Sequence, residues 1–282
     1  MKSKFFPPNH RLSPFINGYV YWDDNVAESR EILFTVKGTA SLSIPLHDDF
    51  TCIVSGKNLK ENCLAHKESV KPVIYGQMTS FGKVRVEGHV QLIFVIFTPL
   101  GLHAFLRMDA HSYTDKIIFM KNIEGVHVDE LRNFQFKRQA SIQTNISLLD
   151  QVLLRSFDLN SNTGNHSILI PLVQALLKTH GTISVYKLAE MAGVSTRTLE
   201  LHFKKFIGLS PKTYCRIVRF NSLIQQLSET PQLDSYEWIE KYGYSDQSHF
   251  IKDFKDFTGM SPMKYFKDPS WDDYVLNKSI SK

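Results

Sequence analysis

Cysteines, targeting signals and long apolar runs are scarce in this sequence, and each scarcity excludes a class of protein. The 282 residues include three cysteines, Cys52, Cys63 and Cys215, with no Cys-x-x-Cys pair, which argues against a disulfide scaffold and a thiolate zinc site. The first residues lack the apolar core of a signal peptide. The uncharged, mostly apolar run Val90–Leu106 is interrupted by a proline and a glycine and falls short of a membrane span. These absences predict a soluble, cytoplasmic protein with reduced thiols and no membrane partner.

Charge is modest overall but unevenly distributed. The net charge of +5 is too small to identify a partner, and 43% apolar residues are enough to build two compact domains. Between Ser195 and Arg219, however, six basic residues stand against the single acid Glu200. Such a stretch can bind a polyanion, although a solvated helix face would have the same composition.

Hydrophobic periodicity divides the chain into two halves. Short β-branched and aromatic runs between turn residues predict strands at 18–22, 31–36, 40–44, 51–54, 70–77, 82–86 and 90–98. Helical spacing follows at 100–107, 129–136 and 142–157, and continues after the polar segment 160–166. The sequence therefore predicts an α+β protein. We expect a mostly β, barrel-like domain with helices over 1–160, a linker at 161–166, an all-helical domain over 167–268 and a tail at 269–282.

An internal repeat indicates how the helical half is built. The segment HFKKFIGLSPKTY at 202–214 recurs as DFKDFTGMSPMKY at 253–265. Each copy follows a short amphipathic segment that ends in glycine, LAEMAG at 188–193 and WIEKYG at 238–243. Ser195 and Asp246 are placed to cap the helices that follow. The repeat therefore predicts two helix-turn-helix units.

Helical spacing assigns an inner and an outer face to the second helix of each unit. The inner faces carry Leu199, Phe203, Phe206, Phe250, Phe254 and Phe257. The outer faces combine bases with hydrogen-bonding side chains, as a helix in a DNA major groove requires. They carry Arg197, Glu200, Leu201, Lys204, Lys205, Gln247, Ser248, His249, Lys252 and Lys255. Leu201 suits contact with a thymine methyl, although scattered surface leucines are common. Glu200 must either accept from a cytosine amino group or cap a neighbouring arginine.

The stretch between the two units predicts one long helix. Residues 211–227 contain no interior helix breaker, and their apolar residues recur at helical spacing. Such a helix would fix the separation of the units. Its two arginines, Arg216 and Arg219, are expected either to pair with acids or to contact phosphates.

These motifs resemble the AraC/XylS family of bacterial transcription regulators. The resemblance rests on LAEMAGVSTRTLELHFKKFIGLSP, RIVRFNSLIQQL and YGYSDQSHFIKDFKDFTGMSPMKY, and it covers residues 166–268. It implies that two recognition helices, Ser195–Phe206 and Asp246–Phe257, enter successive major grooves on one face of DNA. The DNA-binding residues implied are Ser195, Thr196, Arg197, Thr198, Glu200, Leu201, Lys204, Lys205, Asp246, Gln247, Ser248, His249, Lys252 and Lys255.

The same resemblance implies double-stranded DNA and RNA polymerase as partners, with a homodimer as one option for assembly. The chain departs from the family in the second unit, where Ser235, Trp238 and Ile239 replace the usual isoleucine and alanine pattern. The first domain resembles the family's sensory and dimerisation domains only loosely. Its aromatic residues and strand number suit a cavity for a small-molecule effector, but they would equally form the plain core of a domain that only dimerises.

Neither enzyme chemistry nor a cofactor is expected. None of the three cysteines has the cationic or metal-bound neighbours that activate a thiolate. The tetrad Ser261–Lys264 matches Ser-x-x-Lys, but its place in the repeat makes it a helix start. The sequence has no His-x-His motif and no glycine-rich phosphate loop, and the run His47, Asp48, Asp49 is better explained by a turn than by a metal site.

Overall fold

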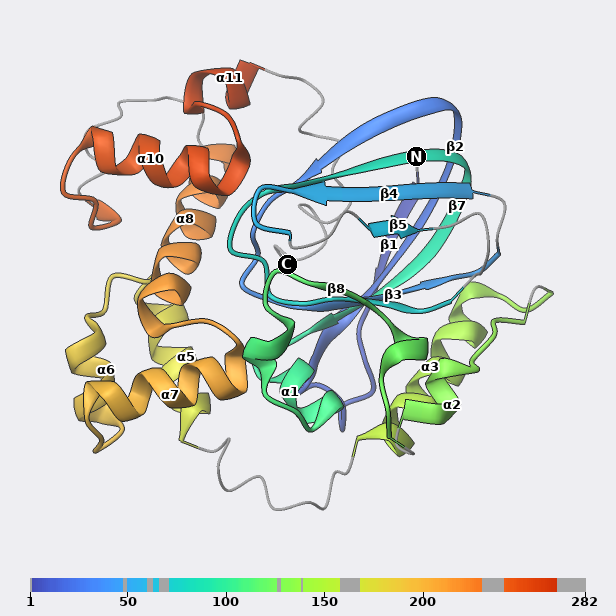
Figure 1. Ribbon diagram of the computed structural model, residues 1–282, viewed down its shortest axis with the longest axis horizontal. Helices are drawn as coiled ribbons and strands as arrows, with labels where there is room; N and C mark the ends of the chain where they lie inside the picture. Colours follow the sequence, from blue (N-terminus) through green and yellow to red (C-terminus); the bar gives the residue numbers. More distant parts are fainter. Residues whose placement is uncertain are drawn as a thin grey trace.

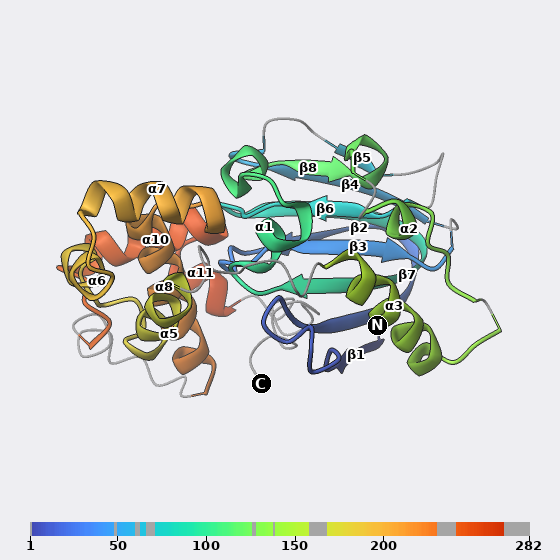
Figure 2. The same cartoon turned by 90° about the horizontal axis from the view of Figure 1, so that it is seen from below.

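The computed structural model describes residues 2–47, 50–59, 63–65, 71–125, 128–137, 139–157, 168–229 and 241–267. A strand-built domain and a helical domain lie side by side (Figure 1), which confirms the expected α+β class. Seen from below, the helical domain sits at one end of the sheet (Figure 2). The expected linker at 161–166 and tail at 269–282 lie outside the described residues, so the domain boundaries stay a prediction.

The first domain is built on an eight-stranded antiparallel sheet. Its strands are β1 (Lys2–Phe6), β2 (Ile16–Phe34), β3 (Ser41–Pro45), β4 (Phe50–Gly56), β5 (Cys63–Ala65), β6 (Val73–Tyr75), β7 (Gly82–Phe97) and β8 (Ile117–Phe119). Their spatial order is β1-β2-β7-β3-β6-β8, and β4 pairs with both β7 and β5. β7 therefore has β2 along one edge, and β4 followed by β3 along the other.

Two strands are longer than the sequence predicts. The expected strands 18–22 and 31–36 are parts of a single strand, β2. Its pairing with β7 shifts register between Val26 and Arg30, near the polar centre of the strand. The expected strands 82–86 and 90–98 are likewise joined in β7, which continues through Gly88. The predicted breaks were wrong because polar residues in a strand centre resemble a turn. In the folded chain, the neighbouring strand supplies the hydrogen bonds that keep this backbone extended.

Both faces of the sheet are buried, because successive side chains along a strand point to opposite sides. On one face, Tyr19 and Val95 belong to a core that also contains residues of the covering helices. On the other face, Val20 and Phe94 belong to a core whose buried members come from β2, β4 and β7. This second core is surrounded by strands, which gives the domain the barrel-like character that the sequence predicts.

Among its described residues, the first domain also contains three helices and two short 3-10 turns. They are α1 (Gly101–Leu106), η1 (Ala110–Tyr113), η2 (Met120–Asn122), α2 (Asp129–Arg132) and α3 (Ile142–Ser156). α1 and α3 agree with the helical spacing at 100–107 and 142–157. α2 is shorter than the predicted helix 129–136, because the Asn145 side chain bonds the backbone N–H and C=O of Lys137 at 3.0 and 3.1 Å. Those bonds replace the helical ones that the segment gives up.

The second domain contains the helices on which the candidate site depends. They are α5 (Leu169–Lys178), α6 (Val185–Met191), α7 (Thr196–Ile207), α8 (Pro211–Glu229), α10 (Gln247–Thr258) and α11 (Pro262–Lys267). α8 confirms the long connecting helix expected over 211–227. The core of this domain also takes in Val36 and Leu100 of the first domain. Within the described ranges, no helix has the length and apolar character needed to cross a membrane.

Candidate nucleic-acid interface

The first helix-turn-helix unit consists of α6, a tight turn and α7. Ser184 caps α6 and Ser195 caps α7, which confirms the cap predicted at Ser195. Each hydroxyl accepts the backbone N–H three residues further on, at 3.1 Å. The turn passes through Gly193, whose φ of +64° lies in the left-handed region that favours glycine. A capped start and a glycine turn therefore set the direction in which α7 leaves the unit.

The inner face of α7 is the one that the sequence predicts. Leu199 and Phe203 are fully buried, and Phe206 is 5% exposed. Leu201, on the opposite side, is 60% exposed. Burying such a side chain contributes roughly 1.5–3 kcal/mol, so the apolar inner face determines which side of α7 remains open.

The outer face of α7 combines cations with hydrogen-bonding groups. Its exposed residues are Ser195, Thr196, Arg197, Glu200, Leu201, Lys204 and Lys205. Thr198 is half-buried, and its hydroxyl lies 2.9 Å from that of Ser195. Lys205 lies over the ring of Phe206, with 5.3 Å between the ammonium and the ring centroid. The arrangement leaves Arg197 at the start of the helix and the two lysines at its end.

The second unit repeats this construction in α10. Asp246 caps the helix by accepting the backbone N–H of His249 at 2.8 Å, and this bond lowers the pKa of the Asp246 carboxyl. The inner face holds Phe250, Phe254 and Phe257 at 7%, 0% and 1% exposure. Both features confirm the prediction made from the repeat. The departing residues Ser235, Trp238 and Ile239 lie outside the described residues.

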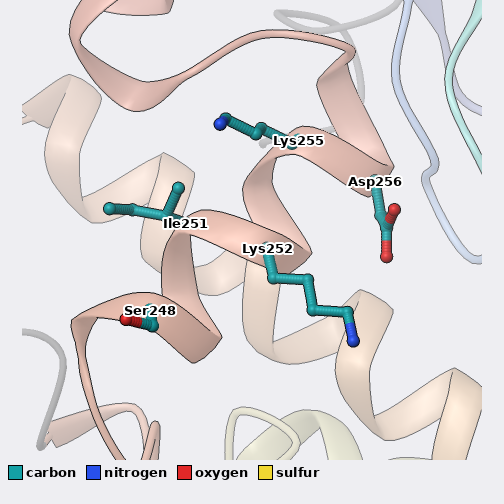
Figure 3. Close-up of a pocket in the computed structure, with 5 residues that line it drawn as sticks. All are labelled: Ser248, Ile251, Lys252, Lys255 and Asp256. Atoms are coloured by element: carbon teal, nitrogen blue, oxygen red, sulfur yellow. The ribbon is translucent and has the colours of Figure 1, made fainter.

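The outer face of α10 forms an open groove of about 420 Å³ lined by Ser248, Ile251, Lys252, Lys255 and Asp256. Figure 3 shows the lysine side chains reaching away from one another, with Asp256 near the strands of the first domain. Gln247 is also exposed. The groove therefore brings together Ser248, Lys252 and Lys255 from the predicted set, and adds an acid, Asp256, that the prediction did not include.

His249 differs from the other predicted residues because its ring is turned towards the protein. The ring packs edge-on against Tyr244, with centroids 5.3 Å apart. Its Nδ1 lies 3.3 Å from the Ser245 hydroxyl, and its Nε2 lies 4.0 Å from a carboxylate oxygen of Asp253. His249 is thus held at the edge of the outer face, where it is only partly exposed.

A buried ion pair joins the connecting helix α8 to α10. Arg216 donates to both oxygens of Asp253, with Nη2–Oδ1 at 2.6 Å and Nε at 3.2 and 3.3 Å from Oδ1 and Oδ2. Asp253 is 1% exposed and its carboxylate raises the pKa of the Arg216 guanidinium. Of the two roles left open by the sequence for Arg216, pairing with an acid is the one observed.

Among the described residues, Arg219 bonds backbone carbonyls and not an acid, so its expected phosphate contact stays a prediction. Its guanidinium donates to the backbone carbonyls of Gly243 and Gly181, at 3.1 and 3.2 Å. Gly181 precedes α6 in the first unit and Gly243 precedes α10 in the second. The Arg219 side chain of α8 therefore bonds both units. Its guanidinium carbon also lies 5.4 Å from the centroid of the Tyr244 ring.

The first domain contacts the last turn of each recognition helix. The carbonyl of Gly208, which ends α7, accepts the Thr114 hydroxyl at 2.6 Å and the Nδ1–H of His111 at 3.1 Å. At the end of α10, the Lys57 ammonium lies 3.0 Å from a carboxylate oxygen of Asp256. The outer faces described above are thus presented by a helical domain that the sheet domain holds at two points.

Two of the three cysteines, Cys52 and Cys215, are buried away from this surface. Burial raises the pKa of the Cys215 thiol to about 11. A thiol in such surroundings stays protonated and unreactive near neutral pH. In the described part of the chain, no group of three His, Cys, Asp or Glu residues could hold a metal ion. Of the predicted turn at His47, the two aspartates lie outside that part.

Comparison with known proteins gives separate matches for the two domains. Residues 188–268 match the family model described as a helix-turn-helix domain. Residues 4–119 match the family model described as a domain of unknown function (DUF6597). The first match covers both units and the helix between them.

The curated relatives match about a third of this chain. The F1 operon positive regulatory protein of Yersinia pestis is 32% identical over 89 residues, which are 32% of this chain and 29% of the relative. The multiple antibiotic resistance protein MarA of Salmonella typhimurium is 31% identical over 83 residues, which are 29% of this chain and 65% of the relative. The match thus spans less than two thirds of either relative. Among solved structures, ToxT from Vibrio cholerae has a TM-score of 0.47 and 9% identity over 88% of this chain and 97% of its own.

Proposed function

We propose that this chain is a transcription regulator of the AraC/XylS family that binds specific double-stranded DNA with α7 and α10 in successive major grooves. The observation that carries this proposal is the matched pair of recognition helices. Each is capped at its start, buries phenylalanines on one face and exposes cations on the other. α8 holds the two helices through Arg216 and Arg219. Consecutive major grooves on one face of B-DNA lie ~34 Å apart, which is the spacing that a rigid pair of helices would read.

The position of each residue along its helix assigns its role. Arg197, at the start of α7, reads guanine through a bidentate contact, and Leu201 packs on a thymine methyl. Lys204 and Lys205, at the end of α7, contact phosphates. In the second unit, Gln247 and Ser248 read bases, His249 contacts the DNA from the edge of the outer face, and Lys252 and Lys255 contact phosphates. Ser195, Thr196, Thr198 and Asp246 lie at the helix starts, where they orient the helices and donate to or approach the DNA backbone.

Footprinting and paired variants test this proposal. DNA selected from a random pool by the full chain should show protections spaced by ~10 base pairs for one protomer. Arg197→Ala should cost ~1–3 kcal/mol of binding free energy and relax preference at one base pair. Lys204→Ala should weaken all sequences alike and lower the dependence of log K on log salt by about 0.9. Lys121→Ala, which removes an exposed cation of the first domain, is the matched control and should change neither quantity.

Equal losses on selected and random DNA for Arg197→Ala would contradict its base-reading role and leave it as a phosphate contact. Failure of the chain to retain any DNA at low salt would contradict the function as a whole and favour the alternative of a solvated helix face.

We further propose that the first domain binds a small-molecule effector. The indole N–H of Trp22 is buried in the strand-enclosed core and has no hydrogen-bond partner among the residues that the structure describes. An unpaired buried donor is costly, so an apolar ligand with one acceptor oxygen would satisfy it. A thermal-shift screen should find a compound that stabilises the chain, and Trp22→Phe should weaken that response while keeping the aromatic packing. A domain that associates with a second copy but responds to no compound would indicate dimerisation alone.

The remaining partners follow from the family and not from a contact in this chain. We propose RNA polymerase as the partner through which DNA binding affects transcription in the cytoplasm, and a homodimer as the form that occupies repeated DNA sites. Sedimentation of the chain with and without DNA tests for the homodimer. Transcription from a selected site with purified RNA polymerase tests for the polymerase as partner.

A further inference from the structure

Two adjacent strand ends of the first domain reach the second recognition helix. Lys57 directly follows β4 and Phe81 directly precedes β7, and the flanking residues Gly56 and Gly82 are paired in the sheet. Lys57 and Phe81 therefore leave the sheet next to one another. Figure 1 shows this end of β4 on the side where the helical domain lies.

Both residues contact the last turn of α10. The Lys57 ammonium lies 3.0 Å from Oδ1 of Asp256. The ring of Phe81 lies over Gly259, since three of its atoms are within 2.7–3.0 Å of the place that a Cβ would take. Gly259 has a φ of +75°, so glycine serves here both the helix end and the close approach of the ring. The contact between Phe81 and Gly259 keeps this end of the sheet, and with it Lys57, beside the last turn of α10.

The acid that Lys57 contacts belongs to the groove on the outer face of α10. Asp256 lines this groove with Lys252 and Lys255, and its other oxygen lies 3.6 Å from Nη2 of Arg216. A carboxylate in a phosphate-binding groove would repel DNA unless cations offset it. Here the two cations beside the carboxylate are Lys57 of the first domain and Arg216 of the second.

The Lys57–Asp256 pair is of the exposed kind, with side chains 54% and 34% exposed. Such pairs are weak because water screens them. A lysine held this loosely can exchange its carboxylate partner for a phosphate without losing a buried contact.

We propose that Lys57 of the first domain belongs to the DNA-contact surface of the second unit, where it binds a backbone phosphate beside Lys252 and Lys255. This inference rests on the proposed function and extends it, because the DNA-contact surface then crosses the domain boundary. The first domain contributes a positive charge to DNA binding whatever effector it binds.

The test is the salt dependence of binding to a random-sequence duplex of about 30 base pairs, which is long enough for two grooves and measures backbone contacts. Lys57→Ala in the full chain should lower the slope of log K against log salt by about 0.9. The ratio of wild-type to variant affinity should then fall about threefold between 0.05 and 0.2 M salt. Lys57→Arg should keep the slope. Lys83→Ala is the matched control, because Lys83 is similarly exposed on the adjacent strand and pairs with Glu31 at 2.6 Å.

An Asp256→Asn background separates a phosphate contact from simple neutralisation of the acid. A slope reduced by Lys57→Ala in both backgrounds supports the proposal. An unchanged slope overturns it, and so does a reduction that disappears with Asp256→Asn, since Lys57 would then only offset the carboxylate. If Lys204→Ala lowers the slope while Lys57→Ala does not, this inference fails and the proposed function stands. If the wild-type chain binds no duplex, both fail.

Discussion

Removing Arg216 should destabilise the second unit more than removing its partner Asp253. The two side chains share three hydrogen bonds, yet Asp253 is 1% exposed while Arg216 is 31% exposed. Arg216→Met leaves a carboxylate buried without its cation, with the His249 ring 4.0 Å away. Asp253→Ala leaves a guanidinium that keeps partial access to water and retains Asp256 at 3.6 Å. The environment of the charge left behind therefore sets the cost.

The magnitudes follow from that asymmetry. Stranding a buried charge costs about 3–5 kcal/mol, and partial exposure of the arginine places Arg216→Met at the lower end, near ~3 kcal/mol. Asp253→Ala loses a charge-assisted hydrogen bond but strands no buried charge, so ~1–2 kcal/mol is expected. The double variant removes the stranded carboxylate and should cost less than Arg216→Met alone. Simple addition of the two single effects is not expected for groups in direct contact.

Urea unfolding of the full chain, followed by far-ultraviolet circular dichroism, measures these free energies. Lys187→Met is the matched control, because it breaks an ion pair with Glu190 in which both side chains are 57% exposed. That change should cost no more than about 0.5 kcal/mol. A double variant less stable than Arg216→Met alone would refute this reasoning. So would a larger loss of unfolding free energy for Asp253→Ala than for Arg216→Met.

Two further predictions concern the cores of the two domains. Phe203→Ala and Phe254→Ala should each cost ~3–5 kcal/mol in urea unfolding, because both rings are fully buried at equivalent repeat positions; a neutral effect of either would mean that the helical phase of the outer faces is wrong. Burial lowers the pKa of Lys37 from 10.5 to about 8, so the unfolded chain binds more protons between those values and stability should rise with pH across that window. Lys37→Met should remove this rise and stabilise the chain at pH 7 by up to about 3 kcal/mol, and a wild-type stability that falls between pH 8 and 10 would contradict the burial of the ammonium.

The helical domain was predictable because its signals are local. Helix caps at Ser195 and Asp246, the glycine turns and the inner phenylalanines each depend on spacing within one helix, and the repeat supplied two copies of the same pattern. The sheet was less predictable because its hydrogen bonds come from distant strands. Asp23, Asp24 and Asn25 look like a turn in sequence, but they pair with 89–91 of β7 and form the middle of β2.

The contacts that complete the site were not visible in the sequence for the same reason. Asp253 occupies the repeat position of His202, and an acid beside two inner phenylalanines was the one available signal that it has a buried partner. Nothing local marked Arg216 as that partner, 37 residues away. Lys57 lies 199 residues from Asp256, in a strand end whose composition suggests only a solvated turn. Local periodicity therefore identifies the inner and outer faces of α7 and α10, whereas the charged contacts that support these helices depend on the fold.

The repeat also explains why the first domain contacts α7 and α10 at equivalent places. Gly208 and Gly259 occupy the same repeat position and end α7 and α10. The first domain contacts both ends, through Thr114 and His111 at Gly208 and through Phe81 at Gly259. α8 joins the same two units from the other side through Arg219. A ligand of the first domain can influence DNA binding only by favouring one arrangement of these contacts over another, and the size of that influence is limited to its difference in affinity for the two.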